Sequence, residues 1–188
     1  LILRKFKPED VWDAFLIYRD KEINRFLPWH PVRSIREMQE FFEKQIFPEY
    51  EKEVAYRYAL EEKETHQVIG YLKLVQIDLQ ARSGALGYGL RREFWNRGLM
   101  IEAARALLSR LREDGFRVVT AAYDQNNPRS GRVLEKLGMR YIRSYEEQWQ
   151  PKNIPVIFRM YQLNLDGDQT RVYRKYWDHS VVHFIEEV

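Results

Sequence analysis

The segment from Trp95 to Met100 brings an asparagine, an arginine and a glycine together directly before an apolar helical pattern. Arg91 and Arg92 precede it and add positive charge. The start of a helix presents unpaired N–H groups and a partial positive charge, and a glycine such as Gly98 lets an anion approach the backbone closely. The segment therefore predicts a site for an anionic group such as a phosphate. An ordinary loop with solvated arginines is the alternative.

Other residue types exclude several chemistries. The sequence has no cysteine, which excludes a thiolate nucleophile, a disulfide scaffold and every cysteine-ligated metal site. The four histidines, His30, His66, His179 and His183, lack metal-ligand spacing, so no metal is predicted. A formal net charge of +3 is weak evidence for nucleic acid binding, and nucleic acid is not expected as a partner. No stretch approaches the length of a membrane-spanning helix, and we expect a cytoplasmic protein.

The elements that must position this chemistry follow from apolar periodicity. A helix after Lys7 places Val11, Trp12, Phe15 and Leu16 on a core face, and Ser34 with Glu37 has the spacing of a capping box. Asn127 before Pro128 predicts the cap of a later helix. The expected order is a strand at 1–6, two helices before residue 47, strands at 54–60, 68–77 and 85–90, a helix at 99–114, a strand at 116–123, a helix at 128–137, and strands at 140–149 and 156–165.

Two regions of this pattern are unusual. The expected strand at 85–90 contains Gly87 and Gly89, which suits a bulge or the close approach of another backbone or a ligand. After residue 165 the chain is aromatic and charged, and the alternation of Val181, His183 and Ile185 is compatible with one more edge strand. The order of elements predicts one mixed α/β sheet with helices on both faces.

The sequence resembles the GNAT superfamily of N-acetyltransferases, and within it the RimJ/RimL-type branch that acetylates ribosomal protein N-termini. The resemblance covers about residues 1–165, leaving 166–188 as a C-terminal extension packed on or continuing the same domain. It rests on the order and spacing of several motifs along one chain: Leu3-Arg4-Lys5-Phe6, Arg25-Phe26-Leu27-Pro28-Trp29, Val68-Ile69-Gly70-Tyr71, Leu86-Gly87-Tyr88-Gly89-Leu90, Phe94-Trp95-Asn96-Arg97-Gly98-Leu99-Met100-Ile101-Glu102-Ala103, Asn127-Pro128-Arg129-Ser130 and Val133-Leu134-Glu135-Lys136-Leu137-Gly138-Met139.

This resemblance implies a GNAT fold, with a mostly antiparallel mixed sheet and a splayed strand pair that holds acetyl-coenzyme A as co-substrate. The pantetheine arm would pair with the strand at 88–90, and the pyrophosphate would rest on the amides of 97–100. Asn96 and Met100 depart from the smaller or different residues usual in the family. The implied cofactor-binding residues are Tyr88, Gly89, Leu90, Asn96, Arg97, Gly98, Leu99, Met100, Asn127 and Ser130.

The implied reaction is direct attack of a neutral primary amine on the thioester. The tyrosine that protonates the leaving thiolate in many relatives corresponds to Leu134, so the resemblance assigns that role to Ser130, with Asn127 as a polar contact to the cofactor. Ala85 occupies the position where relatives often carry a glutamate base. Without that base, α-amines are the better acceptors because their pKa of about 7.7–8.0 leaves them partly neutral at cellular pH. Weaker candidates for a base are Glu37, Glu40 and Asp78.

The expected function is acetylation of a protein or peptide N-terminal α-amine, by a monomer or a homodimer without a membrane partner. The alternatives are an acetyltransferase for a small-molecule amine, such as a polyamine or an antibiotic, and a catalytically idle acetyl-coenzyme A-binding module. A pI near 9.0 alone suggests a third class, an RNA- or ribosome-binding protein. Trp29 and His30 lie in a loop that borders the acceptor site in this family, and a packing role for Trp29 is equally compatible with the sequence.

Overall fold

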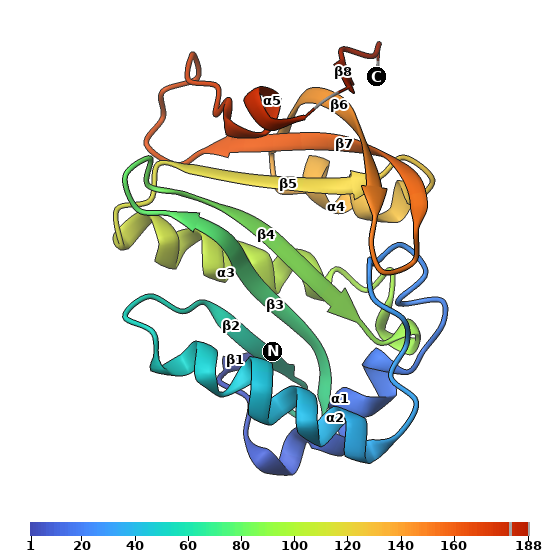
Figure 1. Cartoon of the computed structure of the whole chain (residues 1–188). Helices are drawn as coiled ribbons and strands as arrows, with labels where there is room; N and C mark the ends of the chain where they lie inside the picture. The colour runs from blue at the N-terminus through green and yellow to red at the C-terminus, as the bar shows by residue number, and fades with distance from the viewer. Residues whose placement is uncertain (181, 188) are drawn as a thin grey trace. The chain divides into compact units, whose positions relative to one another are not determined.

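The computed structural model describes residues 1–180 and 182–187. Its strands follow the order β1-β2-β3-β4-β5-β7-β6-β8 in one open sheet (Figure 1). The pair β4–β5 is parallel, and β1–β2, β2–β3, β5–β7, β6–β7 and β6–β8 are antiparallel, which confirms the expected mixed α/β class. The strands are β1 (Ile2–Arg4), β2 (Arg57–Glu61), β3 (Val68–Asp78), β4 (Ser83–Leu90), β5 (Val118–Asp124), β6 (Arg140–Trp149), β7 (Ile154–Asn164) and β8 (Val182–Phe184).

The α-helices are α1 (Val11–Tyr18), α2 (Ile35–Phe41), α3 (Leu99–Glu113), α4 (Pro128–Lys136) and α5 (Lys175–His179). Short 3-10 segments are η1 (Pro8–Asp10), η3 (Pro48–Glu51) and η4 (Arg92–Phe94), and a π-helical turn, η2 (Phe42–Ile46), continues α2. The chain forms two compact units: a first unit of Leu1–Leu74 with Gly87–Ala103, and a second unit of Val75–Leu86 with Ala104–Val188.

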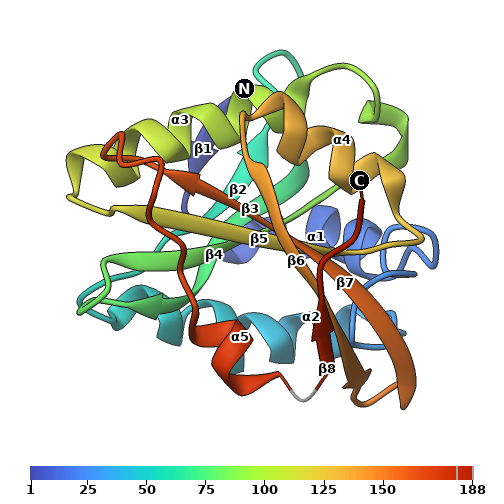
Figure 2. The same cartoon turned by 90° about the horizontal axis from the view of Figure 1, so that it is seen from above.

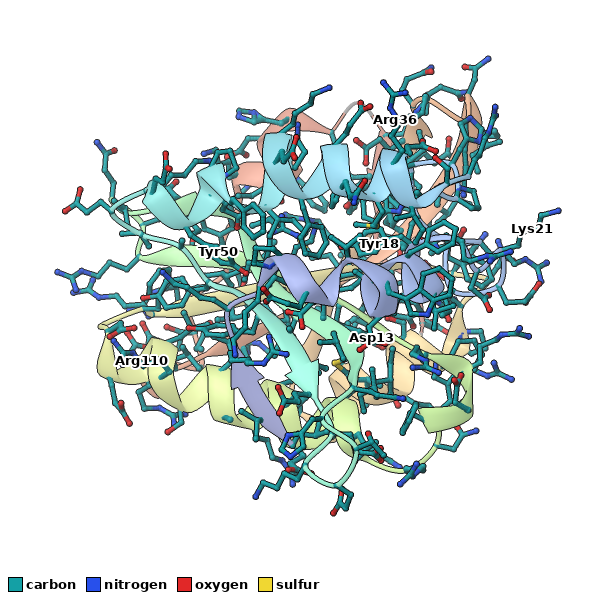
Figure 3. The ribbon with its side chains drawn as sticks, turned by 90° about the horizontal axis from the view of Figure 1, so that it is seen from below. Asp13, Tyr18, Lys21, Arg36, Tyr50 and Arg110 are labelled. Atoms are coloured by element: carbon teal, nitrogen blue, oxygen red, sulfur yellow. The ribbon has the colours of Figure 1, made fainter. Side chains whose placement is uncertain are left out.

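In the first unit, α1 and α2 pack on β2 and β3 through an aromatic core. Figure 3 shows Tyr18 between α1 and α2, and its ring centroid lies 5.2 Å from those of Phe41 and Tyr71. On the opposite side of α1, the Asp13 carboxylate accepts a hydrogen bond from the Val68 N–H at 2.8 Å. These contacts fix α1 relative to the strand β3.

The cap of α2 and the buried face of α1 were both predicted from the sequence. The Ser34 hydroxyl caps α2 as predicted, accepting from the Glu37 N–H at 3.2 Å, while the Glu37 carboxylate accepts from the Arg33 N–H rather than from the cap residue. The prediction that Trp12 faces the core is wrong, because its side chain is 58% exposed. The buried residues of α1 are Ala14, Phe15, Ile17 and Tyr18, so its core face is rotated away from Trp12.

In the second unit, β5 pairs with β7 along its length and β6 pairs with β7. The parallel register of β4 with β5 runs from Ser83 opposite Val118 to Ala85 opposite Thr120. The predicted Asn127 cap is present, and Gly131 in α4 lies against the Tyr123 ring, where an added Cβ would come within 2.6 Å of it. The predicted strand at 140–149 coincides with β6, and β7 begins two residues earlier than the predicted 156.

The C-terminal segment, described at residues 166–180 and 182–187, includes α5 and β8 (Figure 2). It accepts hydrogen bonds from side chains of β6 and β7. The Arg143 guanidinium donates to the Tyr173 carbonyl at 3.1 Å, and Arg159 pairs with Glu186 at 2.5 Å. Strand β8 pairs antiparallel with β6, which supplies the expected edge strand through His183, whereas Val181 lies outside the described residues. The division into a 1–165 domain and an extension stays a prediction.

Within the described residues, none of the helices combines the length and the apolar character needed to cross a membrane.

Candidate active site

The Trp95–Met100 segment forms an exposed turn that leads into α3. Asn96 and Gly98 both have positive φ, at +60° and +75°, a conformation that glycine and asparagine tolerate best. A Cβ on Gly98 would meet nothing within 4 Å, so open space lies beside this backbone. The Gly98 carbonyl accepts from the N–H groups of Ile101 and Glu102. In the described part of the chain the N–H groups of residues 97–100 donate to no other group, as an anion-binding helix start requires.

Two of the three arginines around this turn form ion pairs with carboxylates and are less able to bind an anion than the sequence suggested. Arg91 pairs with Glu93 at 2.5 Å, and Arg92 pairs with Asp20 at 2.8 Å. In the part of the chain that the structure describes, Arg97 has a single, distant carboxylate, Glu62 at 3.9 Å, and its side chain is 53% exposed. Arg97 is therefore the cation best able to meet a bound anion, while the other two are largely neutralised.

The predicted cofactor strand, residues 88–90 of β4, lies next to β3. An added Cβ on Gly89 would come within 2.6 Å of the Tyr71 ring, and one on Gly87 within 3.2 Å of Lys73 Cε. The close approach that these glycines permit is thus made by side chains of β3. The Leu90 carbonyl accepts from the Trp95 indole N–H at 2.7 Å, which ties the end of β4 to the turn.

Asn127 and Ser130 lie at the start of α4 in the second unit. The Asn127 side chain accepts from the Ser130 backbone N–H at 3.4 Å, so its capping role is confirmed. Both residues are half-buried. Leu134, at the position of the family's tyrosine, is 1% exposed and belongs to the core. Its burial explains an apolar residue there, and leaves the assignment of Ser130 as proton donor a prediction.

The candidate bases have the wrong surroundings. Hydrogen bonding to Lys44 lowers the pKa of the exposed Glu40, and a hydrogen bond from the Ala81 backbone lowers the pKa of Asp78. A lowered pKa makes a carboxylate a weaker proton acceptor. Glu37 accepts hydrogen bonds at the start of α2. None of these carboxylates stands out as a base.

A cluster in the first unit was missed by the sequence analysis. Arg57 on β2 lies directly opposite Lys73 on β3, so both side chains share one face of the sheet. Glu49 on η3 binds Arg57 Nε at 2.7 Å and Nη2 at 2.6 Å. Lys73 Nζ lies 5.2 Å from the ring centroid of Trp29. A single charged residue between apolar neighbours, as Lys73 is between Leu72 and Leu74, is the signal that could have identified this cluster.

Trp29 itself is firmly held. Its indole N–H donates to Asn24 Oδ1 at 3.0 Å, and Asn24, 1% exposed, donates in turn to the carbonyls of Ile17, Tyr18 and Asp20. Its ring stacks near Tyr18 with centroids 6.4 Å apart. The packing role of Trp29 is therefore real, while His30 next to it is exposed.

The turn fits the phosphate-bearing cofactor that the resemblance implies. It combines open space beside Gly98 with an exposed arginine, Arg97. The backbone N–H groups of residues 97–100 have no acceptor among the described residues and can donate to an anion. Among the described residues no group of three or more histidines, aspartates or glutamates is arranged to hold a metal ion.

Comparison with known proteins identifies the family. Residues 1–140 match the acetyltransferase (GNAT) domain family. The chain is 26% identical over 157 residues to an uncharacterized N-acetyltransferase, p20, of Bacillus licheniformis, covering 78% of this chain and 84% of that protein. A match to the uncharacterized protein YkkB of Bacillus subtilis, 32% identical over 93 residues, spans 48% of this chain and about half of that protein, 54%.

Solved structures show the same fold with different acceptors. Spermidine N-acetyltransferase from Vibrio cholerae, solved with CoA and spermine, has a TM-score of 0.74 at 16% identity and covers 88% of this chain and 95% of its own. Ribosomal-protein-S5-alanine acetyltransferase from Vibrio fischeri has a TM-score of 0.71 at 21% identity, covering 88% and 93%. The family match, the fold and the turn before α3 agree, and the chain belongs to the acetyltransferase (GNAT) family as an N-acetyltransferase domain with acetyl-coenzyme A as its co-substrate.

Proposed function

We propose that this domain acetylates the N-terminal α-amine of a protein or peptide. The observation that carries the proposal is Ala85, which lies on β4 at the position where relatives often carry a glutamate base. Without that carboxylate, an acceptor that is already partly neutral has the advantage. The α-amine, with a pKa of about 7.7–8.0, meets this condition, and a lysine or polyamine amine near 10.4 does not.

The proposed cofactor contacts divide between backbone and side chain. The N–H groups of Arg97, Gly98, Leu99 and Met100 would receive the pyrophosphate, with Asn96 shaping the turn. The backbone of Tyr88, Gly89 and Leu90 would pair with the pantetheine arm, and Asn127 would add a polar contact. Acetyl-coenzyme A supplies the activated acetyl group. The buried Met100 side chain, 6% exposed, packs into the core and leaves its N–H to act from the backbone.

Ser130 is the proposed proton donor to the leaving sulfur. Its backbone N–H donates to the Asn127 cap, which holds the residue at the third position of α4. A donor that acts as the leaving group gains charge lowers the barrier more than it strengthens binding. Replacement of Ser130 should therefore affect turnover more than cofactor affinity.

A thiol-release assay at several pH values tests the proposal. We would compare a lysine-free peptide with a free α-amine, the same peptide blocked at its N-terminus and carrying one lysine, and spermidine. At pH 7 the α-amine should be acetylated at least about 10-fold faster, and the rate with lysine should rise with pH toward the pKa of that amine. Equal or better turnover of spermidine at pH 7 would contradict the α-amine preference.

A catalytically idle acetyl-coenzyme A-binding module is the second candidate. Ala85 favours it, as does the departure of Asn96 and Met100 from the family pattern. In the same assay, calorimetric binding of acetyl-coenzyme A without release of free thiol for any amine would support this candidate instead.

A further inference from the structure

The register of β2 and β3 places two cations side by side in the first unit. Arg57 is opposite Lys73, and their side chains lie on the face that α1 and the following loop cover. Like charges directly opposite each other on a sheet repel, and burial removes the water that would screen them. Such a pair needs compensating negative charge.

The chain supplies only part of that compensation. Glu49 binds Nε and Nη2 of Arg57, whereas Nη1 is buried and has no hydrogen-bond partner among the described residues. The whole residue is only 7% exposed. In the described part of the chain, the Lys73 ammonium has neither a hydrogen bond nor a carboxylate within ion-pair distance. Its neighbours are the rings of Trp29 at 5.2 Å and Tyr71 at 6.0 Å. Ring faces attract a cation and leave its N–H donors unused.

The other groups around the pair do not carry the missing charge. Burial raises the pKa of Tyr18 on α1 and Tyr50 on η3 to about 12, and raises that of Tyr71 on β3, so all three phenols are neutral near pH 7. Burial and the neighbouring Arg57 lower the pKa of Lys73 to about 8, which leaves it mostly protonated at pH 7. Among the described residues, Glu49 is therefore the one carboxylate that compensates these two cations.

The pair also lies beside the strand proposed to bind the cofactor. The Lys73 stem crosses Gly87, where an added Cβ would be 3.2 Å from Lys73 Cε, and Gly87 directly precedes Tyr88. Trp29, which Lys73 faces, belongs to the loop between α1 and α2 and is fixed by the buried Asn24. Rigid aromatic walls and unused donors are features of a preformed recognition site.

We propose that Lys73 and Arg57 form a subsite for an anionic group of the amine acceptor, a carboxylate or a phosphate. This inference rests on the proposed acetylation of an α-amine and narrows its substrate class to acceptors that carry negative charge near the amine. The Lys73 ammonium and Arg57 Nη1 donate hydrogen bonds to the anion, which completes the charge balance that Glu49 begins. A polyamine would instead bring positive charge toward two cations.

Matched peptides test the subsite. We would use lysine-free peptides with a free α-amine that carry Asp, Asn, phosphoserine or Ser at the second, third or fourth position. The thiol-release assay gives kcat/KM for each, and we expect the anionic member of at least one pair to be preferred by about 10-fold. The Asp/Asn and phosphoserine/Ser comparisons distinguish a carboxylate from a phosphate.

Three variants assign that preference to Lys73. In Lys73→Met the anionic-to-neutral ratio should fall to about 1, and in Lys73→Arg, which keeps the charge, it should remain above 1. Lys5→Met is the matched control, because Lys5 also faces an aromatic ring, Tyr50 at 5.0 Å, but is exposed. This control should keep the wild-type ratio. Equal values for both members of every pair, or a preference that persists in Lys73→Met, would overturn the subsite.

Calorimetric binding of the same peptides separates this inference from the proposed function. Selective binding of anionic peptides that is lost in Lys73→Met, without acetylation of any peptide, would refute α-amine acetylation and retain the subsite. Acetylation of neutral and anionic peptides at equal rates with equal affinities would refute the subsite and retain α-amine acetylation.

Discussion

Each unit of the molecule has a cation that is withdrawn from solvent, Arg143 buried and Lys73 half-buried, and the surroundings of the two differ. In the second unit Arg143, 1% exposed, lies opposite the apolar Met160 on β7 and donates to the Tyr173 carbonyl, while the Trp177 ring lies 5.4 Å from its guanidinium. In the first unit Lys73 lies opposite another cation, Arg57, and donates to no described residue. Burial lowers the pKa of both Lys73 and Arg143, so both carry a desolvation cost.

What differs is the use of the donors. Arg143 binds the C-terminal segment to β6, so its charge contributes to holding the fold together. Among the described residues, the Lys73 ammonium, Arg57 Nη1 and the amides before α3 donate to no acceptor; in Arg143 only Nε shares this condition, while Nη2 is used. Donors without partners are costly to a fold, and we propose that those of the first unit serve ligands. The predictions below test this difference, beginning with the largest effect.

Gly98→Glu should abolish most cofactor binding in the first unit. A side chain would enter the open space beside the turn, the positive φ would be strained, and a carboxylate would repel the pyrophosphate. We expect acetyl-coenzyme A affinity to fall at least about 100-fold by calorimetric titration, with the circular dichroism spectrum retained. Gly138→Glu, another open glycine with positive φ but in the second unit, is the control for strain. Unchanged affinity in folded Gly98→Glu would reject the phosphate site.

Arg143→Met should destabilise the second unit. The substitution removes a donor to the carbonyl of the half-buried Tyr173 and removes the contact with Trp177. We expect the free energy of unfolding to fall by about 1–3 kcal/mol in urea. Arg110→Met, which removes an exposed ion pair with Asp114, should change it by less than about 1 kcal/mol. An Arg143→Met protein as stable as the wild type would show that this cation does not stabilise the fold.

Ser130→Ala should separate turnover from binding in the second unit. The alanine keeps the backbone N–H that Asn127 caps, so α4 should remain intact. We expect kcat to fall by about 100-fold or less, with acetyl-coenzyme A affinity nearly unchanged by calorimetry. Ser109→Ala, an exposed serine on α3, is the control. An undiminished rate in Ser130→Ala would remove this serine from the mechanism.

The preference for anionic acceptors should decrease at alkaline pH. Lys73, whose pKa is lowered to about 8 by burial and by Arg57, is charged below that value and loses its charge above it. The ratio of kcat/KM for an anionic and a neutral peptide should therefore fall as pH rises through 8, by several-fold, and should stay level in Lys73→Arg. Both peptides carry the same α-amine, so the effect of its titration on kcat/KM cancels when the ratio is taken. A wild-type ratio that stays level up to pH 9.5 would contradict this role of Lys73.

The sequence predicted the elements with strong local signals. Apolar periodicity located α3 and β6, and the Asn127-Pro128 pair located the start of α4. The turn at Gly98 was found because glycine before a helix has a defined local conformation. Trp12 was misplaced because several helical stripes include it, and only packing of α1 on the sheet decides which one is buried.

The Arg57–Lys73 cluster could not be derived from local pattern. The sequence predicted a strand at 54–60 and no role for Arg57, whereas β2 begins at Arg57 and that arginine is itself buried. Arg57 lies opposite Lys73 because of the register of β2 with β3. The two cations have one carboxylate near them in the described structure because Glu49 on η3 packs against Arg57. Both features depend on contacts between residues that are far apart in the sequence, so a local sequence pattern does not predict them.

The unfolding free energy of Lys73→Met at pH 7 tests most directly whether Lys73 serves a ligand rather than the fold. If the lysine serves an acceptor, methionine in its place removes a half-buried charge opposite Arg57 and preserves an apolar contact with Trp29. We expect stability to increase, by on the order of 1 kcal/mol in urea unfolding. A loss of stability comparable to that of Arg143→Met would contradict the account, because it would show that both cations hold the fold in the same way.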